Sequence, residues 1–168
     1  YAVNYFYQNI NGSANDQVLS ANASILNKNK KLGATLFLNF RDREMYDHNA
    51  DNFSELPLLN TGSAGSNLFY LINPNQKLEL NLSYTNEYRY GGEMINVPSH
   101  ETQQSEERLH KVWMGSIDYQ WNFNDNKSTL ILYAAGQQTV RDHYTGILPD
   151  STEELIAFQN NPPYGNSL

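Results

Sequence analysis

Residues 77–90, KLELNLSYTNEYRY, alternate apolar and polar side chains along their whole length. Leucines and tyrosines fill the even positions, interrupted only by Asn86, and polar or charged residues fill the odd positions. Because successive side chains of a β-strand point to opposite faces, this period of two predicts one strand with an apolar and a polar face. The stretch is longer than the roughly 5–6 residues usual in soluble domains. It satisfies the about 9–11 residues that a tilted membrane-crossing strand needs.

The same alternation recurs on both sides of this stretch. We predict about seven strands, at 1–9, 17–26, 31–42, 64–73, 77–90, 110–123 and 128–141. Tight turns rich in Asn, Asp and Pro are expected at 27–30, 73–76 and 124–127, and long polar segments at 43–62, 91–109 and 142–168. The one helix expected is short and follows Ser151, because Ser151 and Glu154 form a capping-box pattern.

Short and long connections that alternate are typical of outer-membrane β-barrels, whose periplasmic turns are short and whose outer loops are long. Aromatic residues also gather toward the two ends of the strands, with Tyr84, Tyr88 and Tyr90 at one end and Trp121 and Phe123 at the other. Aromatic girdles at the two bilayer interfaces have this distribution. We therefore expect an all-β, antiparallel up-and-down meander that forms a segment of a large transmembrane β-barrel with long outer loops.

The composition narrows the classes of function. The formal net charge of −7 over 168 residues argues against binding to nucleic acid, which requires clustered Lys and Arg. The sequence contains no cysteine, and it lacks a nucleophile elbow, a zinc-protease motif, a phosphate loop and a dinucleotide fingerprint, so we expect no enzyme. No apolar run approaches the roughly 20 residues of a membrane helix. A mean hydropathy of −0.64 is compatible with barrel strands, which are half polar.

The sharpest local motif is an acidic stretch at 47–55. Oxygen-bearing groups recur at alternate positions, as in a calcium loop: Asp47, Asn49, Asp51, the carbonyl of Phe53, and Glu55. The sixth position, usually Gly, is Asn52, a residue that tolerates a left-handed backbone. Position 12 is Leu58 and not an acid, which excludes an EF-hand. The sequence predicts a Ca²⁺ site here, and a solvated acidic loop is the alternative.

A second set of polar residues is expected to meet solute. On the polar side of the strands, Glu79, Glu87, Arg89 and Asp118 are predicted to face the barrel lumen, where they line the plug or the solute path. In the next long loop, His100 and Glu101 are candidate ligand-facing residues. Paired acids and histidines also suit acid–base chemistry or a metal. Without a motif that defines their geometry, a hydrated loop is the better interpretation of that segment.

Several phrases of the sequence resemble TonB-dependent receptors of Bacteroides-type bacteria. They are RDREMYD at 41–47, DNFSELP at 51–57, NEYRYGG at 86–92, VPSHET at 97–102 and QTVRDHYTG at 138–146. The resemblance spans about residues 30–147 and is to receptors for siderophores or cobalamin. It identifies the class of barrel better than the cargo.

The resemblance implies a location in the bacterial outer membrane and a role in active transport. Such receptors have a barrel of usually 22 strands, filled by a plug domain through which TonB acts. Residues 1–168 would then be a partial barrel, with the plug and the rest of the barrel absent. The implied partners are the plug, TonB through the plug, the lipid bilayer and an extracellular small molecule such as a siderophore, cobalamin or a glycan. The alternative from another class is a soluble, calcium-assisted β-sandwich adhesin or glycan-binding module, with Leu78, Leu80 and Leu82 buried against a second sheet.

Overall fold

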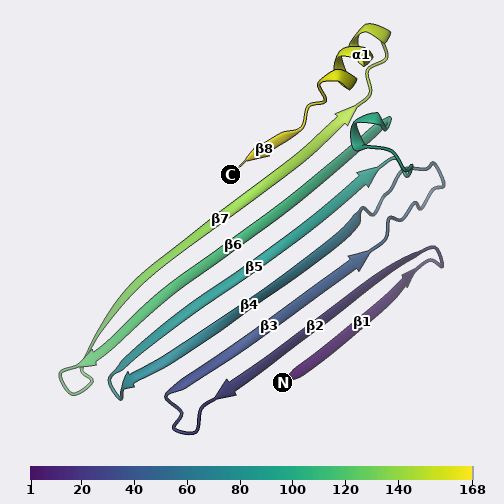
Figure 1. The fold of residues 1–168 in the computed structure, drawn as a ribbon. Helices are drawn as coiled ribbons and strands as arrows, with labels where there is room; N and C mark the ends of the chain where they lie inside the picture. The colour runs from purple at the N-terminus through teal and green to yellow at the C-terminus, as the bar shows by residue number, and fades with distance from the viewer. Residues whose placement is uncertain (168) are drawn as a thin grey trace.

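The computed structural model describes residues 1–167, and their strands form one antiparallel sheet. The eight strands lie side by side in the order of the chain, as an up-and-down meander (Figure 1). They are β1 (Ala2–Ile10), β2 (Ala14–Leu26), β3 (Leu32–Arg43), β4 (Leu58–Asn73), β5 (Gln76–Gly92), β6 (Gln104–Phe123), β7 (Ser128–Ile147) and β8 (Gly165–Ser167). The predicted all-β meander is confirmed. The sheet is open, because β1 and β8 are its two edges.

The three predicted tight turns join β2 to β3, β4 to β5 and β6 to β7, all at one end of the sheet, which we call the turn end. Their chemistry explains their shape. Asn124, Asp125 and Asn126 all have positive φ, between 54° and 63°, a conformation that Asn and Asp tolerate better than other non-glycine residues. Between β4 and β5 only Pro74 and Asn75 intervene. Such short connections leave neighbouring strands no alternative to antiparallel pairing.

The opposite end, which we call the loop end, differs from the prediction in three ways. First, the strands run further: β4 begins at Leu58 and not at 64, β6 begins at Gln104 and not at 110, and β7 continues to Ile147 and not to 141. Backbone pairing continues here although the apolar alternation has ceased. Secondly, β8 is an eighth strand inside the predicted loop 142–168. Thirdly, the connection between β1 and β2 at this end is short, because only residues 11–13 separate the two strands.

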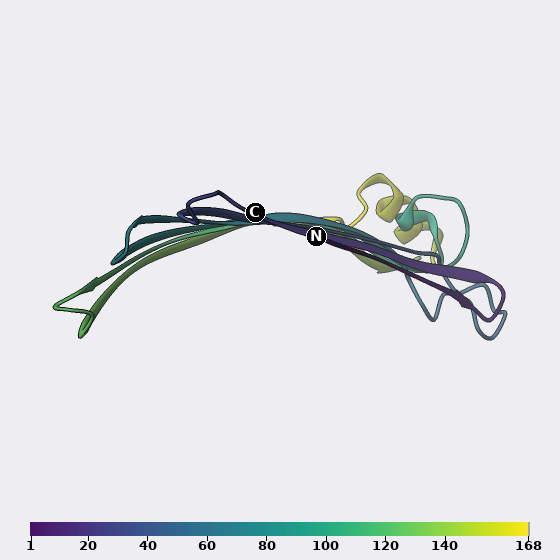
Figure 2. The ribbon, with the colours of Figure 1, turned by 90° about the horizontal axis from the view of Figure 1, so that it is seen from below.

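The predicted helix is present as α1 (Thr152–Asn160). The side chain of Ser151 accepts a hydrogen bond from the Glu154 backbone amide and donates one to the Glu154 carboxylate. A single turn of 3-10 helix, η1 (Ser99–Glu101), lies in the connection between β5 and β6. Seen edge-on, α1 and the loop with η1 rise on one side of the sheet, whereas the loop between β3 and β4 extends to the other side (Figure 2).

The register places the apolar rows of β2 to β6 on one face, whereas β7 is apolar on both faces, with Leu132 on this face and Ile131 and Tyr133 on the reverse. One row crosses seven strands through directly paired residues: Val3, Ala21, Leu38, Ala64, Tyr84, Trp113 and Gln138. We call this the apolar face and its reverse the polar face. Side chains on the apolar face are widely accessible, with Leu82 50% and Trp113 59% exposed. Residues 1–167 contain a single sheet, so the second layer that a β-sandwich requires is not among them.

Apart from Gly33, which lies under the Phe69 ring, burial is confined to the loop end. The buried apolar residues are Ala14, Tyr46, Leu59, Tyr90 and Tyr144, and none of them lies in the middle of the sheet or at its turn end. The described residues therefore have no core of the usual kind. Loops that fold over the two faces at this end supply the burial.

Two apolar exceptions on the polar face have a packing reason. The ring of Phe37 in β3 covers Gly65 of β4, and the ring of Phe69 in β4 covers Gly33 of β3. Each aromatic ring lies over the glycine that pairs with it, and a Cβ atom at either glycine would overlap the ring. Phe37 interrupts the apolar alternation in the sequence because its ring packs on Gly65 of the neighbouring strand.

Candidate functional site

The acidic stretch forms a closed loop between β3 and β4. Tyr46 and Leu56 pair across its neck, where the Tyr46 amide donates to the Leu56 carbonyl at 3.0 Å and the Leu56 amide donates back at 3.1 Å. Within the loop, Ala50 and Asn52 have φ of 63° and 68°. The left-handed backbone expected at Asn52 is thus present, and it allows the chain to coil tightly.

Three of the five predicted calcium ligands converge. Carboxylate oxygens of Asp47, Asp51 and Glu55 all lie within 4.8 Å of one another. Two oxygens that each lie about 2.4 Å from a Ca²⁺ ion cannot be more than about 4.8 Å apart, so this separation fits the ion. Asn49 takes part in the same loop by hydrogen bonding Asp51, and Phe53 pairs with Glu93.

Backbone amides hold these carboxylates in position. Asp47 accepts from the amides of Ala50 at 2.7 Å and Asn52 at 2.8 Å, and Asp51 accepts from the Phe53 amide at 2.8 Å. Each carboxylate oxygen has a second lone pair that remains available to a cation. The loop is therefore shaped by its own backbone, and the residues present fit a calcium ion.

The residues predicted to face the lumen divide into two groups. Glu79, Glu87, Arg89 and Asp118 share the polar face, and Glu79 pairs directly with Asp118. His100 and Glu101 lie instead in η1, on the loop that rises on the other side of the sheet, where His100 Nδ1 and the Tyr164 hydroxyl are 3.1 Å apart. The structure does not bring these two groups together.

A cluster of arginines on the polar face was not predicted. All five arginines of the chain occupy two adjacent rows of this face near the loop end: Arg43, Arg89 and Arg108 in one row, and Arg41 and Arg141 in the next. His143 continues the first row and His110 lies in the second. We call the five arginines the arginine rows. The sequence signal was available, because each arginine falls on the polar parity of its strand.

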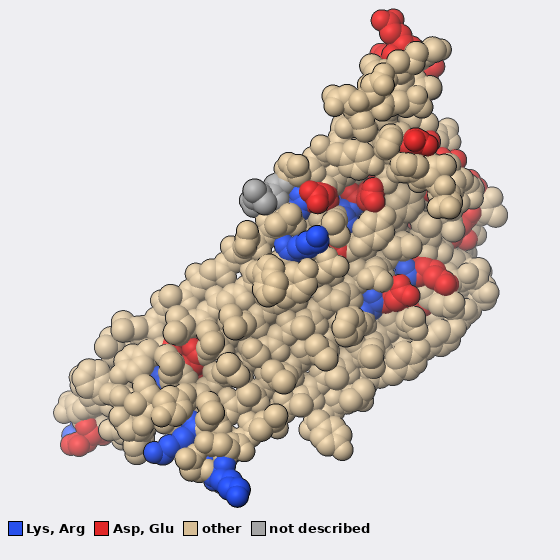
Figure 3. Space-filling model, in the orientation of Figure 1, with Lys and Arg blue, Asp and Glu red and all other residues tan. Residues whose placement is uncertain are grey.

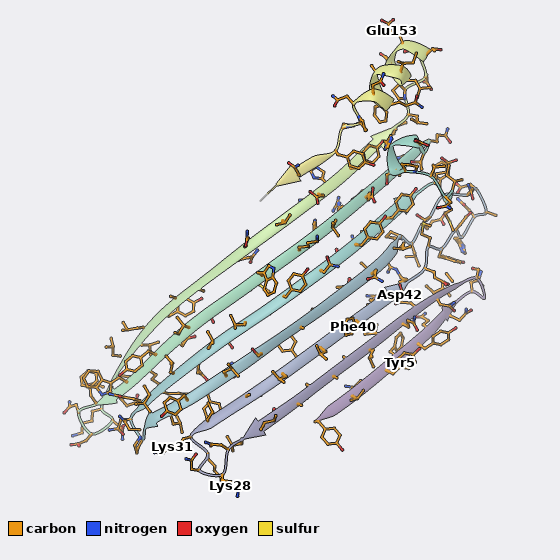
Figure 4. All side chains as sticks on the ribbon, in the orientation of Figure 1. Tyr5, Lys28, Lys31, Phe40, Asp42 and Glu153 are labelled. Carbon is orange, nitrogen blue, oxygen red and sulfur yellow. The ribbon has the colours of Figure 1, made fainter. Side chains whose placement is uncertain are left out.

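The lysines are distributed differently. Four of the six lie in the short turns, and Lys28 and Lys31 mark the turn end in Figure 4. Lys77 is the second residue of β5 and lies close to the turn end. Lys111 lies on the apolar face. The arginine rows are therefore a local concentration of positive charge within a chain whose net charge is −7.

The arginines differ in their partners. Arg41 forms a two-pronged ion pair with the buried Asp16, with Nε–Oδ1 and Nη2–Oδ2 separations of 3.0 and 2.6 Å, and Arg108 pairs with Glu106. Arg43 donates only to the Pro57 carbonyl, at 3.1 Å. Within residues 1–167, Arg89 has no ion pair, and its Nε is buried without a hydrogen-bond partner.

A hollow of about 870 Å³ lies between the acidic loop and the polar face. Its wall on the loop side includes Asp51, Phe53 and Pro57, and its floor on the sheet side includes Arg89 and Glu106. The loop is tied to β5, since the Ser54 amide donates to the Gly92 carbonyl and the Gly92 amide donates to the Ser54 hydroxyl, both at 2.9 Å. The candidate calcium loop and the arginine rows thus border one space.

The other side of the loop end is an aromatic cluster on the apolar face. Tyr144 is completely buried, its ring 5.1 Å from that of Tyr164 and 6.3 Å from that of Phe158 in α1. Burial raises the pKa of Tyr164, and the nearby Glu107 carboxylate raises it further. These contacts fasten the segment after β7 to the sheet.

No protein-family model matches the chain, and no curated protein or solved structure matches it either. Among residues 1–167, no helix has both the length and the apolar character to cross a membrane.

Proposed function

We propose that this chain is part of the wall of an outer-membrane β-barrel that imports a scarce nutrient with TonB coupling. One observation carries the proposal: a single sheet has most of its apolar rows on one side and most of its charge on the other. An exposed apolar face of this size must be covered by other apolar groups. In the wall of a membrane barrel, lipid covers it. The polar face would then line the lumen and meet the plug.

The position of the charges supports a lipid-facing band. On the apolar face the paired strands carry four charged residues, Asp42, Glu107, Lys111 and Asp142, all near the loop end. The polar face carries eleven, which are Asp16, Arg41, Arg43, Lys77, Glu79, Glu87, Arg89, Glu106, Arg108, Asp118 and Arg141. In Figure 3 the middle of the visible face is almost free of charge, and the charged side chains gather toward its two ends.

The height of the uncharged band agrees with a bilayer. In β6 it runs from Trp113 to Phe123, which meets the about 9–11 residues that a tilted membrane strand requires. Aromatic pairs mark both limits, with ring centroids of Tyr84 and Trp113 4.4 Å apart at one limit and those of Trp121 and Phe123 5.2 Å apart at the other. Amphipathic rings favour the two interfaces of a membrane.

The outer loops, the calcium site and the plug have separate roles in such a barrel. The loops at the loop end face outward and meet an extracellular small molecule such as a siderophore complex, cobalamin or a glycan. Calcium held by Asp47, Asp51 and Glu55 stiffens the first of these loops, because the ion removes the repulsion among three carboxylates. TonB acts through the plug and not through this segment.

Spin labels test the proposal in the full-length gene product in lipid bilayers. Residues 1–168 contain no cysteine, so once any cysteine elsewhere in the protein is replaced, Leu82→Cys and Thr85→Cys place single labels on opposite faces of β5. We expect the label at 82 to collide readily with dissolved oxygen and to be shielded from a water-soluble nickel reagent. The label at 85 should not show that preference for oxygen, and a label at Lys127→Cys, in a short turn, should meet the nickel reagent. A label at 82 that meets the nickel reagent as freely as the one at 127 rules out the lipid-facing assignment.

A further inference from the structure

Within the described residues, the arginine rows place two like charges opposite each other, which is electrostatically unfavourable. Arg89 and Arg108 are directly paired across β5 and β6, and like charges placed opposite each other destabilise a sheet. Arg108 is relieved by Glu106, whereas Arg89 forms no ion pair in residues 1–167, although Glu87 lies on the same face two residues away. A positive group that keeps this position without a partner is suited to an anion that comes from elsewhere.

Side-chain nitrogens without a hydrogen-bond partner recur on this part of the polar face. The Nε atoms of Arg89 and Arg141 are buried without hydrogen-bond partners, and so are Nε2 of His110 and Nδ1 of His143. All four residues lie on the polar face of three consecutive strands, β5, β6 and β7. A buried donor without a partner is unfavourable, and of these four residues Arg89 is the one that lines the hollow.

The hollow above Arg89 determines what kind of anion fits. Its volume of about 870 Å³ lies within the range of small-molecule sites, roughly 300–1,000 Å³. Of its two acids, Glu106 is already paired with Arg108, and Asp51 belongs to the calcium cluster. Arg89 is the positive group that reaches the space without a partner of its own, and Arg43 lies in the same row, across β4.

We propose that this hollow binds a small anion with several carboxylate or phosphate groups, held by Arg89, with Arg43 in the same row across β4. The guanidinium group suits the task, because its planar set of donors matches carboxylate and phosphate geometry. The inference deepens the proposed function and rests on it for the import of that ligand. The binding site itself depends only on the geometry of the loop end.

Calorimetry with the detergent-purified full-length protein tests the site. The probe is tricarballylate, which carries three carboxylates, and its uncharged triamide is the control ligand. We expect wild-type protein to bind tricarballylate and not the triamide. Arg89→Gln should weaken binding by about tenfold or more, because it removes a charge-assisted hydrogen bond of roughly 1.5–3 kcal/mol. Arg89→Lys, which retains the charge, should weaken it less.

Lys127→Gln is the matched control, since it removes the same charge from a short turn at the other end of the sheet, and its binding should equal that of wild type. An equal loss in Lys127→Gln and Arg89→Gln would mean that only net charge matters, and the site would be refuted. Failure of the wild type to bind either tricarballylate or pyrophosphate at millimolar concentration would refute it too, and would leave the arginines as partners of carboxylates on another part of the protein. The spin-label experiment is independent, so failure of the anion site is distinguishable from failure of the barrel assignment.

Discussion

The two faces of the sheet share one backbone and one set of hydrogen bonds, yet they carry different surfaces. The apolar face presents leucine and aromatic rows such as Leu36, Leu38 and Phe40, all about half exposed. The polar face presents amides, hydroxyls and most of the charge of the strands. Because both faces share the same backbone, they differ only in which residues occupy the odd and the even positions of each strand.

The two faces also differ in how their residues are distributed along the strands. The apolar face is uniform from strand to strand, as expected of a surface that meets a featureless solvent such as lipid. On the polar face the positive residues are separated along the strands. The arginines gather near the loop end, and Lys77 lies near the turn end. Asp42 and Phe40, labelled in Figure 4, show the same boundary on the apolar face, because the charged residue lies one row nearer the loop end.

The largest effect should come from a charge placed on the apolar face. Leu82→Arg in the full-length protein is expected to lower the free energy of unfolding in lipid vesicles by about 2–4 kcal/mol, the cost of Arg near the bilayer midplane. Thr85→Arg, on the polar face of the same strand, should lower it by less than about 1 kcal/mol. Denaturant titration of both variants measures the difference. Equal losses on the two faces would remove the distinction on which the proposed function depends.

The space around the glycines differs between the two faces. A Cβ at Gly65, on the polar face, would overlap the Phe37 ring and lie 2.8 Å from the backbone oxygen of Leu82, whereas a Cβ at Gly136, on the apolar face, meets nothing within 4 Å. We expect Gly65→Ala to cost about 1–3 kcal/mol of unfolding free energy, as overpacking does. Gly136→Ala should be neutral or slightly stabilising, since Gly in a strand carries an entropic cost. Thermal unfolding of the two variants in the same detergent tests this, and the reverse order would contradict the ring-over-glycine packing.

Within the arginine rows, we expect Arg41 to stabilise the fold and Arg89 to bind the ligand. Arg41→Gln removes the partner of Asp16, which is only 6% exposed, and should lower the unfolding free energy by about 1 kcal/mol or more. Arg89→Gln removes no ion pair within the described residues and takes away a charge that faces Arg108, so it should leave the unfolding free energy unchanged or raise it. Unfolding curves of the two variants, recorded without added anion, provide the measurement. A larger loss in Arg89→Gln than in Arg41→Gln would assign Arg89 to the framework of the protein.

The sequence predicted the middle of the sheet well because period-two alternation is a local property. Strand ends at the loop end were underestimated, since residues 104–110 carry polar groups on both faces and leave no apolar row to follow. The arginine rows depend on register between strands. Arg43, Arg89 and Arg108 are far apart in the chain and meet in one row only when β3 to β6 are aligned. Side-chain parity was readable from the sequence, but the alignment of the strands was not.

The acidic loop could be predicted because its ligand spacing is local too, and its test has the smallest expected effect on stability. Calcium chloride added to the full-length protein should release heat that is lost in Asp51→Asn. This variant has the same shape and removes one charge: its side-chain oxygen can still accept from the Phe53 amide, whereas the hydrogen bond that the Asn49 side chain donates to the second oxygen is lost. Asp125→Asn, in a short turn far from the cluster, should bind calcium like the wild type.

The thermal midpoint should rise only slightly with calcium, because the loop lies at the edge of the structure and opens without the sheet. Binding heat and not stability is therefore the decisive readout. If wild type and Asp51→Asn release the same heat, the ion does not use this carboxylate. The convergence of Asp47, Asp51 and Glu55 would then be explained by the backbone amides alone.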